Sequence, residues 1–283
     1  QEWALPLHLV QMPGAGAGGG AVGSGGESSR GAGAGALDSP PPEALAAGLL
    51  ARVAARRVAP VVLRVDCAQP WAETEAAFRD AVMRGRRLRV HLHNAELPDT
   101  SALALLLQRC YEGLQAAASA EGLALEEADV TPWLEEEPPA GLQTPSPSGG
   151  TALGPCRLRG PRFEHVVLGG TFDHLHAGHK VLLTVAACLA TSELAIGVSG
   201  PPLLQGKRGA SALEPWARRA GAVAEFLALV QPKLPLRIEV LMDGYGPALH
   251  RQMQALVVSA ETESGGSSVN TRRQCSGTST TWA

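Results

Sequence analysis

Residues 165–183 read HVVLGGTFDHLHAGHKVLL and combine an apolar segment, two glycines and a second apolar segment. The apolar residues 165–168 predict a strand, the glycines predict a turn, and residues 181–183 begin a helical pattern. A glycine turn between a strand and a helix is a common phosphate site, because the first N–H groups of the helix are unpaired. This run therefore predicts phosphate binding.

Two pairs of residues in this run support that prediction. Gly169 and Gly170 lack a Cβ, so the backbone of the turn can approach a phosphate closely. The spacing of His176 and His179 places both imidazoles on one face of a first helical turn. Structural histidines and metal ligands are the alternatives, but Asp173 is the one close additional ligand candidate and no full ligand set is predicted.

The motifs Gly-Thr-Phe-Asp at 170–173 and His-x-Gly-His at 176–179 resemble the signature of the nucleotidylyltransferase superfamily. Residues 169–183 are most similar to the phosphopantetheine adenylyltransferase domain of animal bifunctional coenzyme A synthases. The similarity continues, in the same order, through residues 203–207, 214–219, 225–227, 243–247 and 256–262. This resemblance implies an α/β protein whose C-terminal half is a Rossmann-like, doubly wound parallel sheet.

The resemblance also implies an activity: transfer of an adenylyl group from ATP to phosphopantetheine, giving dephospho-coenzyme A and pyrophosphate in coenzyme A biosynthesis. ATP with Mg²⁺ is then the substrate complex, and no tightly bound protein metal is implied. An in-line phosphoryl transfer depends on positioning and charge stabilisation rather than on a protein nucleophile. Hydrogen-bond donors are therefore the side chains to look for.

The resemblance assigns roles to individual residues. His179 matches the donor to the α-phosphate, His176 a neighbouring phosphate contact, and Thr171 the hydroxyl between the reacting phosphates. Lys207 matches a mobile lysine in the loop after the second strand, which would complete the catalytic set. The implied nucleotide- and substrate-binding positions are Gly169, Gly170, Phe172, Asp173, Arg219, Glu261, Asn270 and Arg273.

Some of these positions have plainer alternatives. Arg219 lies in a helical pattern beside another arginine, where a solvated or ion-paired side chain is common. The apolar residues 255–258 predict a buried parallel strand, and ligands of open α/β sheets bind beyond the carboxyl ends of such strands. The residues that follow, 259–273, therefore either meet the nucleotide or form a flexible Ser/Gly loop.

The family pattern stops after Arg273. Residues 274–283 lack apolar periodicity and do not match, so we interpret them as an alternative end. Without a last strand and helix, one sheet edge and one apolar face would lack cover, which favours instability or association into an oligomer. The chain also lacks a P-loop of the form Gly-x-x-x-x-Gly-Lys-Ser/Thr, so kinase activity is not predicted.

Two other functions remain open. A truncated, non-catalytic form that binds nucleotide or a partner would explain the unmatched end. A cytidylyltransferase with another phosphorylated acceptor would share the His-x-Gly-His chemistry but not the later blocks.

Composition divides the chain into parts, since its 33 glycines are unevenly placed. Helices are expected at 43–55, 73–83 and 101–118, and strands at 58–65 and 88–92, which indicates a small α/β unit. We predict a disordered Gly/Ala-rich segment (1–41), this α/β unit (42–130), a Pro/Gly/acidic linker (131–162), an incomplete nucleotidylyltransferase domain (163–273) and a non-matching tail (274–283).

The remaining signals concern partners and location. The net charge is −3, so the basic cluster at Arg84, Arg86, Arg87 and Arg89 is interpreted as a solvated turn and not as a nucleic-acid site. His91 and His93 are expected to be structural. Five scattered cysteines favour a reducing compartment, and no transmembrane segment is predicted. We expect a cytoplasmic protein; because the chain begins at Gln1, an upstream mitochondrial targeting segment, and hence association with mitochondria, stays open.

Overall fold

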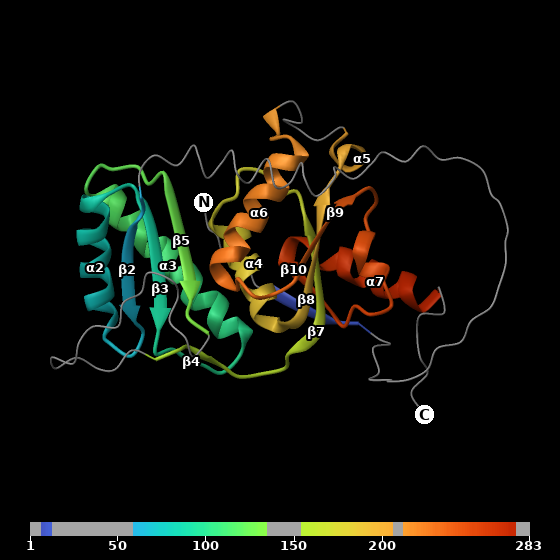
Figure 1. The fold of residues 1–283 in the computed structure, drawn as a ribbon, viewed down its shortest axis with the longest axis horizontal. Coiled ribbons are helices and arrows are strands. Elements are labelled where there is room, and N and C mark those ends of the chain that lie inside the picture. The colour runs from blue at the N-terminus through green and yellow to red at the C-terminus, as the bar shows by residue number, and fades with distance from the viewer. Residues whose placement is uncertain (1–6, 13–58, 135–153, 206–211, 276–283) are drawn as a thin grey trace.

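Two sheets lie side by side in the computed structural model, which describes residues 7–12, 59–134, 154–205 and 212–275 (Figure 1). The larger sheet has the strand order β1-β10-β7-β8-β9, and a smaller one has the order β2-β3-β5. All neighbouring strands are parallel except β1, which runs antiparallel to β10. The predicted α/β class and the parallel sheet in the C-terminal half are confirmed.

The smaller sheet forms the first unit of the fold. Its elements are β2 (Val61–Asp66), α2 (Trp71–Arg84), β3 (Arg87–His93), β4 (Glu96–Leu97), α3 (Thr100–Ala120) and β5 (Glu127–Pro132). The side chain of Asp99 caps α3 by accepting a hydrogen bond from the Ala102 N–H at 2.8 Å. The strands and helices expected between residues 58 and 118 are confirmed to within a few residues, and the helix expected at 43–55 lies outside the described residues.

The described ends of the predicted linker belong to this first unit. Strand β5 continues to Pro132, and β6 (Arg157–Leu158) pairs with β4. Thr131 is buried, and its hydroxyl lies 3.0 Å from Nδ1 of His91, which confirms a structural place for that histidine. The linker predicted at 131–162 is therefore shorter at both ends. Strand β5 extends the small sheet past residue 130, and β6 pairs with β4 of the same unit.

The larger sheet carries the second unit. Its elements are β7 (Phe163–Gly170), α4 (Ala177–Leu189), β8 (Ala190–Ser199), α5 (Pro201–Leu204), α6 (Trp216–Val230), β9 (Leu236–Leu241), η2 (Gly246–Leu249), β10 (Ala255–Ser259), η3 (Ala260–Thr262) and α7 (Glu263–Cys275). The chain passes from β7 to β8 to β9 and then returns to place β10 on the other side of β7. Strand order thus reverses between β7 and β10, which is where open α/β sheets bind ligands.

Helices cover both faces of this sheet. Val166 and Leu168 of β7 pack into the apolar cluster that includes α4 and α6. Val167, between them, points to the opposite face and packs with Ala248 of η2 and Val269 of α7. This alternation explains why β7 reads as a continuous apolar run, and it confirms the doubly wound arrangement.

Strand β1 (Leu7–Gln11) corrects two expectations. It pairs with β10 from Leu7 opposite Ser259 to Gln11 opposite Ala255, so the predicted disordered segment 1–41 is wrong over these residues. The sheet edge at β10, expected to lack a neighbour, is paired by this strand. An unpaired edge exposes N–H and C=O groups, and β1 satisfies those of β10.

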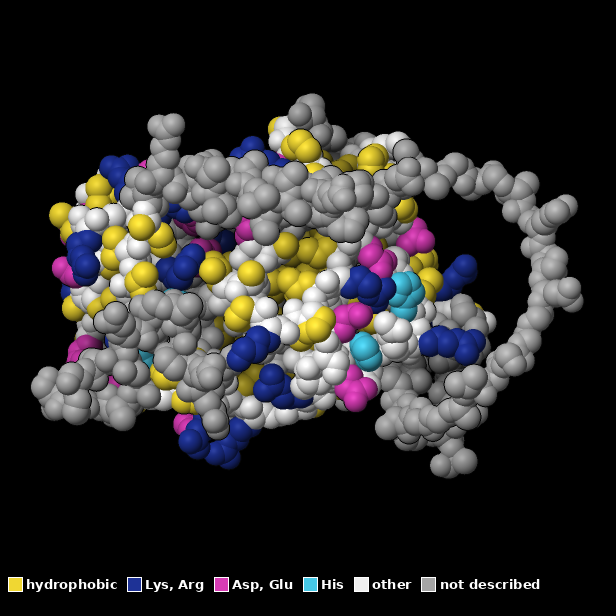
Figure 2. Space-filling view, viewed as in Figure 1, with side chains coloured by type: hydrophobic (Ala, Val, Ile, Leu, Met, Phe, Trp, Pro, Cys, Tyr) yellow, Lys and Arg dark blue, Asp and Glu magenta, His cyan; other side chains and the backbone are white. Residues whose placement is uncertain are grey.

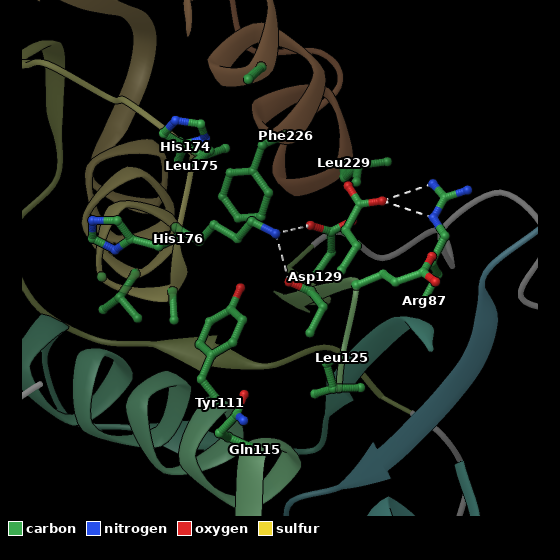
Figure 3. Close-up of a pocket in the computed structure, with 18 of the residues that line it drawn as sticks. Arg87, Tyr111, Gln115, Leu125, Asp129, His174, Leu175, His176, Phe226 and Leu229 are labelled. Atoms are coloured by element: carbon green, nitrogen blue, oxygen red, sulfur yellow. Dashed lines mark hydrogen bonds and ion pairs between the residues drawn. The ribbon is translucent and has the colours of Figure 1, made fainter. Parts of the chain in front are cut away.

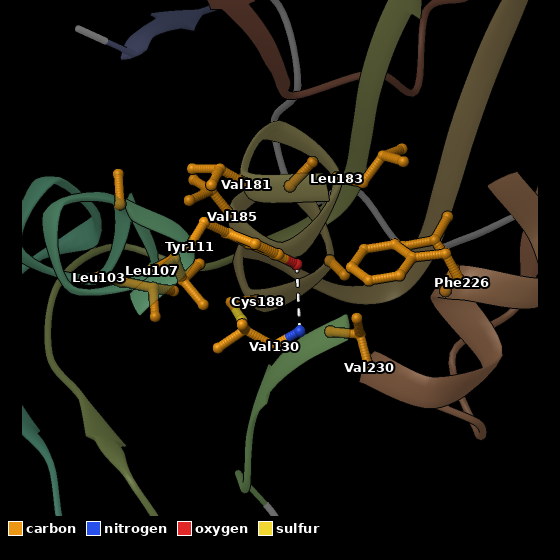
Figure 4. Packing of buried hydrophobic residues seen from close by; sticks show 14 of the residues in the cluster. Leu103, Leu107, Tyr111, Val130, Val181, Leu183, Val185, Cys188, Phe226 and Val230 are labelled. Atoms are coloured by element: carbon orange, nitrogen blue, oxygen red, sulfur yellow. Dashed lines mark hydrogen bonds between the residues drawn. The ribbon is translucent and has the colours of Figure 1, made fainter. Parts of the chain in front are cut away.

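The two units share one apolar core, drawn in Figure 4. Tyr111 of α3 and Val130 of β5 pack with Val185 and Cys188 of α4 and with Phe226 of α6. The Tyr111 hydroxyl accepts a hydrogen bond from the Val130 N–H at 3.1 Å. The first unit therefore packs directly against the helices that cover the larger sheet.

This hydrogen bond gives a test of the shared core. Tyr111→Phe leaves the buried N–H of Val130 without its acceptor, so we expect the free energy of unfolding to fall by about 1–3 kcal/mol in urea titrations at pH 7. Tyr245→Phe is the matched control, because it removes a hydroxyl from a half-buried ring near the surface. Equal stabilities of the two variants would contradict the role of the Tyr111 hydroxyl.

Candidate active site

The turn between β7 and α4 leaves the N-terminus of a helix open. His176 is the N-cap residue of α4, and no side chain caps this helix, in contrast to α3. The Lys180 N–H makes the first helical bond, to the His176 carbonyl at 3.0 Å, so the N–H groups of residues 177–179 have no acceptor within the helix. Such an end attracts anions through its N–H groups and its dipole.

Two histidines stack at this helix end. The ring centres of His176 and His179 are 3.8 Å apart with an angle of 28° between the planes, which confirms that the two share one face. Nδ1 of His179 is buried and has no hydrogen-bond partner among the described residues. Burial, with a smaller contribution from His176, lowers the pKa of His179 to about 4, although Asp173 acts in the opposite direction. At pH 7 this imidazole is neutral and offers one N–H donor.

Phe172 packs its ring against the ring of His179. Its ring is fully buried and lies 5.4 Å from the His179 ring, and its backbone has a φ of 52°, a costly value for a bulky residue. A Cβ on Gly170 would come within 3.0 Å of the Phe172 ring, so the glycine is needed for this packing. Gly170 and Phe172 therefore hold the turn in shape, and the buried Phe172 ring faces the protein interior.

Asp173 joins the turn to the start of α6. Its carboxylate accepts a hydrogen bond from the Glu214 N–H at 2.8 Å, and the Glu214 carboxylate accepts one from the His174 N–H at 3.1 Å. These reciprocal bonds hold the turn on both sides. Glu214 was not among the predicted site residues, although it opens the sequence block 214–219 that the family resemblance already marked.

Arg219 is a structural clamp. The side chain is 2% exposed, and its guanidinium donates to the carbonyl oxygens of Thr171, Ser199 and Glu214 at 2.6, 2.8 and 2.9 Å. It therefore fastens the ends of β7 and β8 to α6. Both sequence interpretations, a ligand contact and a solvated or ion-paired residue, are corrected by this burial.

Arg273 has the same kind of environment on the other face. It is 1% exposed, and its guanidinium donates to the carbonyl oxygens of Ala248, His250 and Met253. The predicted ligand contact is corrected for this residue too. Helix α7, on which it lies, replaces the alternative of a flexible loop after residue 262.

Two other predicted residues lie at the same sheet edge. Thr171 follows β7, and exposed Glu261 lies in η3 directly after the adjacent parallel strand β10. Asn270 is half-buried on α7. Lys207 belongs to residues 206–211, which lie outside the described residues. Within the described ranges, no group of three or more His, Cys, Asp and Glu side chains is arranged to hold a metal.

A cavity of about 1150 Å³ opens beside this site (Figure 3). Its walls are the first turn of α4 with the residues before it (His174–Gly178), one face of α6, and α3 with β5 of the first unit. Tyr111, Phe226 and Leu229 give it apolar walls, and acidic and basic side chains lie among them. The volume is sufficient for an organic substrate.

The surface charge of the first unit is mixed. Arg87 of the basic cluster pairs with Glu127 at 2.8 Å, and Arg84 with Asp80 at 3.5 Å. On the face drawn in Figure 2, basic and acidic side chains are interspersed. Among the described helices, none is long and apolar enough to cross a bilayer.

The clamp at Arg219 predicts a large difference between two neighbouring arginines. Arg219→Met leaves buried carbonyl groups without their donor, and we expect the free energy of unfolding to fall by about 3 kcal/mol or more. Arg218→Met, the control, removes a side chain that is 65% exposed and pairs with Glu214, and should cost less than about 1 kcal/mol. Chemical unfolding measures both, and similar losses would refute the clamp.

The lowered pKa of His179 predicts a pH dependence of stability. In the unfolded chain a histidine titrates near its ordinary value of about 6.5, so between that pH and about 4 the unfolded state binds more protons. The free energy of unfolding should therefore fall as the pH is lowered through this range. From pH 7 to pH 5, urea titrations should show a smaller loss in His179→Gln than in the wild type. A His179 variant that loses as much stability as the wild type over this range would contradict the burial.

Comparison with known proteins gives the family. No family model matches the chain. A phosphopantetheine adenylyltransferase from Saccharomyces cerevisiae is 38% identical over 121 residues, which cover 41% of this chain and 40% of the yeast protein. The chain thus spans about two fifths of the length of that relative. A solved structure of a protein with unknown function from Archaeoglobus fulgidus shares 32% identity, covering 40% of this chain and 89% of that one, with a TM-score of 0.35.

Archaeal relatives are covered more fully. The phosphopantetheine adenylyltransferase of Methanopyrus kandleri is 40% identical over 116 residues, which are 40% of this chain and 71% of that protein. The enzyme of the same name from Pyrococcus horikoshii is 37% identical over 114 residues, again 40% of this chain and 71% of the relative. This chain belongs to the phosphopantetheine adenylyltransferase family.

Proposed function

We propose that this chain transfers the adenylyl group of ATP to phosphopantetheine, releasing pyrophosphate and forming dephospho-coenzyme A. The observation that carries the proposal is the stacked pair His176 and His179 at the uncapped N-terminus of α4. This pair follows β7, where the strand order of the sheet reverses. The names of the archaeal and yeast relatives support the same substrates.

In the proposed reaction, a terminal phosphate oxygen of phosphopantetheine bonds to the α-phosphorus of ATP. The bond between that phosphorus and the oxygen that bridges the α- and β-phosphates breaks, and pyrophosphate leaves with the electrons of that bond. Negative charge grows on the α-phosphate oxygens in the transition state. Three kinds of hydrogen-bond donor would stabilise this charge: the N–H of neutral His179, the side chain of His176, and the backbone N–H groups of residues 177–179, which have no acceptor within the helix.

The remaining predicted side chains also have proposed roles. We assign the Thr171 hydroxyl to the space between the two reacting phosphates, and Lys207, Glu261 and Asn270 to substrate contacts, on the sequence resemblance. ATP would arrive as its Mg²⁺ complex, with the cation as part of the substrate. Phe172, Asp173 and Arg219 serve the reaction by holding the turn still, since preorganised donors need no rearrangement when charge develops.

The wider setting is also a proposal. The blocks between residues 169 and 262 resemble the adenylyltransferase part of animal bifunctional coenzyme A synthases, and we assign the chain to that type of enzyme. The same proposal places the protein in the cytoplasm, with association with mitochondria as the alternative. It also includes assembly into oligomers.

Pyrophosphate release by the purified chain tests this function. With ATP, Mg²⁺ and phosphopantetheine, we expect release that requires the acceptor, and His179→Ala should lower kcat by about two to four orders of magnitude, as lost oxyanion-type donors do. The control is His174→Asn, since residue 174 has a φ of 43° that asparagine tolerates. It should stay within a few-fold of the wild type. Acceptor-independent release, or an active enzyme indifferent to His179→Ala, would overturn the assignment; ATP binding without release would favour the nucleotide-binding alternative.

A further inference from the structure

A buried ion pair connects the two units next to the candidate site. Nζ of Lys180 donates to Oδ1 of Asp129 at 2.7 Å and to the carbonyl of Ala128 at 2.7 Å. The Lys180 and Asp129 side chains are both 8% exposed. Lys180 follows His179 in α4, whereas Ala128 and Asp129 lie in β5 of the first unit. Asp129 is labelled in Figure 3.

Lys180 also closes the first turn of α4 through its backbone. Its N–H donates to the carbonyl of His176, and its own carbonyl accepts from the Thr184 hydroxyl at 2.8 Å. Its ammonium lies 5.7 Å from the ring centre of Phe226 on α6. One residue thus ties the turn that carries both histidines to α6 and to β5.

Stability alone gives no reason for an ion pair at this place. Taking two charges out of water costs several kcal/mol per ion, and well-packed apolar side chains of similar size often serve stability as well or better. The pair fixes the orientation of α4 relative to β5, because the ammonium binds a carboxylate and a carbonyl of the same strand at fixed positions. The helix cannot rotate or slide without losing both bonds.

We propose that the first unit positions the transfer site: through Asp129 and Lys180, strand β5 fixes the first turn of α4 and so keeps His176 and His179 stacked. Lys180 and Asp129 are positioning residues, which act through the histidines. The inference rests on the proposed function, because the geometry matters for turnover only if these histidines serve the transfer. It gives the first unit a role in the reaction of the second.

The test replaces both charges together. In Lys180→Met/Asp129→Leu no charge is left buried alone, so we expect a cooperatively unfolding protein of near wild-type stability. Its kcat for pyrophosphate release should fall about tenfold to a hundredfold, as small misplacements of catalytic groups do, with the KM for ATP changing far less. Lys180→Arg, which keeps the charge, should retain more of the activity than the double variant.

A matched control lies outside the cavity. Arg237 and Glu193 form a half-buried pair at 3.1 Å between β9 and β8 of the larger sheet. The double variant Arg237→Met/Glu193→Leu removes the same two charges without touching α4. Its kcat should stay within about threefold of the wild type; a loss equal to that of the Lys180 double variant would show a general effect of charge removal and overturn the inference.

A second readout does not depend on turnover. Proton NMR titration of ¹³C-labelled histidines follows the pKa of His179 in the full-length chain, which should rise from about 4 toward its ordinary value when the first turn loosens and admits water. If the wild type releases no pyrophosphate, the proposed function fails, and the titration still decides whether the pair positions His179. A folded double variant with unchanged His179 pKa would overturn the positioning role, as would an unchanged kcat in an active enzyme. Should the double variant not fold, the titration and kcat of Asp129→Asn, which keeps an acceptor for the Lys180 ammonium but removes the carboxylate charge, decide in the same way.

Discussion

The hydrogen bonds of the Arg219 guanidinium are the interaction on which the site end of the larger sheet depends. Parallel strands end with carbonyl groups that the next turn cannot pair. Here the carbonyls of Thr171, directly after β7, and of Ser199, at the end of β8, accept hydrogen bonds from one buried cation. The same guanidinium binds the carbonyl of Glu214, so it joins the ends of both strands to the start of α6. The turn at Phe172, and after it the histidines and the open end of α4, begin from this fastened point.

Local patterns in the sequence were sufficient to predict the centre of this site. The strand, the turn and the helix around residues 165–183 show in their periodicity, and the spacing of His176 and His179 places them on one face because both lie in one turn. Residues whose partners are distant in sequence were misread. Arg219 and Arg273 resemble solvent-facing or ligand-binding arginines until the fold brings carbonyl groups around them.

The same limit applies to the contacts between the two units. Nothing near Lys180 in the sequence shows that its partner lies in a strand some fifty residues earlier, since buried ion pairs leave no periodic signal. Gly170 shows a related case, in which the sequence marks a residue as special but does not show the packing demand on it. Its missing Cβ makes room for the ring of Phe172, so the demand comes from inside the protein.

The pairing of β1 with β10 has a consequence for how the chain folds. Residues 7–11 pair with residues 255–259, which lie about 250 residues further along the chain. Closing so long a loop is slow compared with forming the local β7–α4–β8 unit, and the edge of β10 stays open until it happens. The pairing of β1 is therefore expected as the last step in completing this sheet, and until then the exposed strand edge is where self-association would begin.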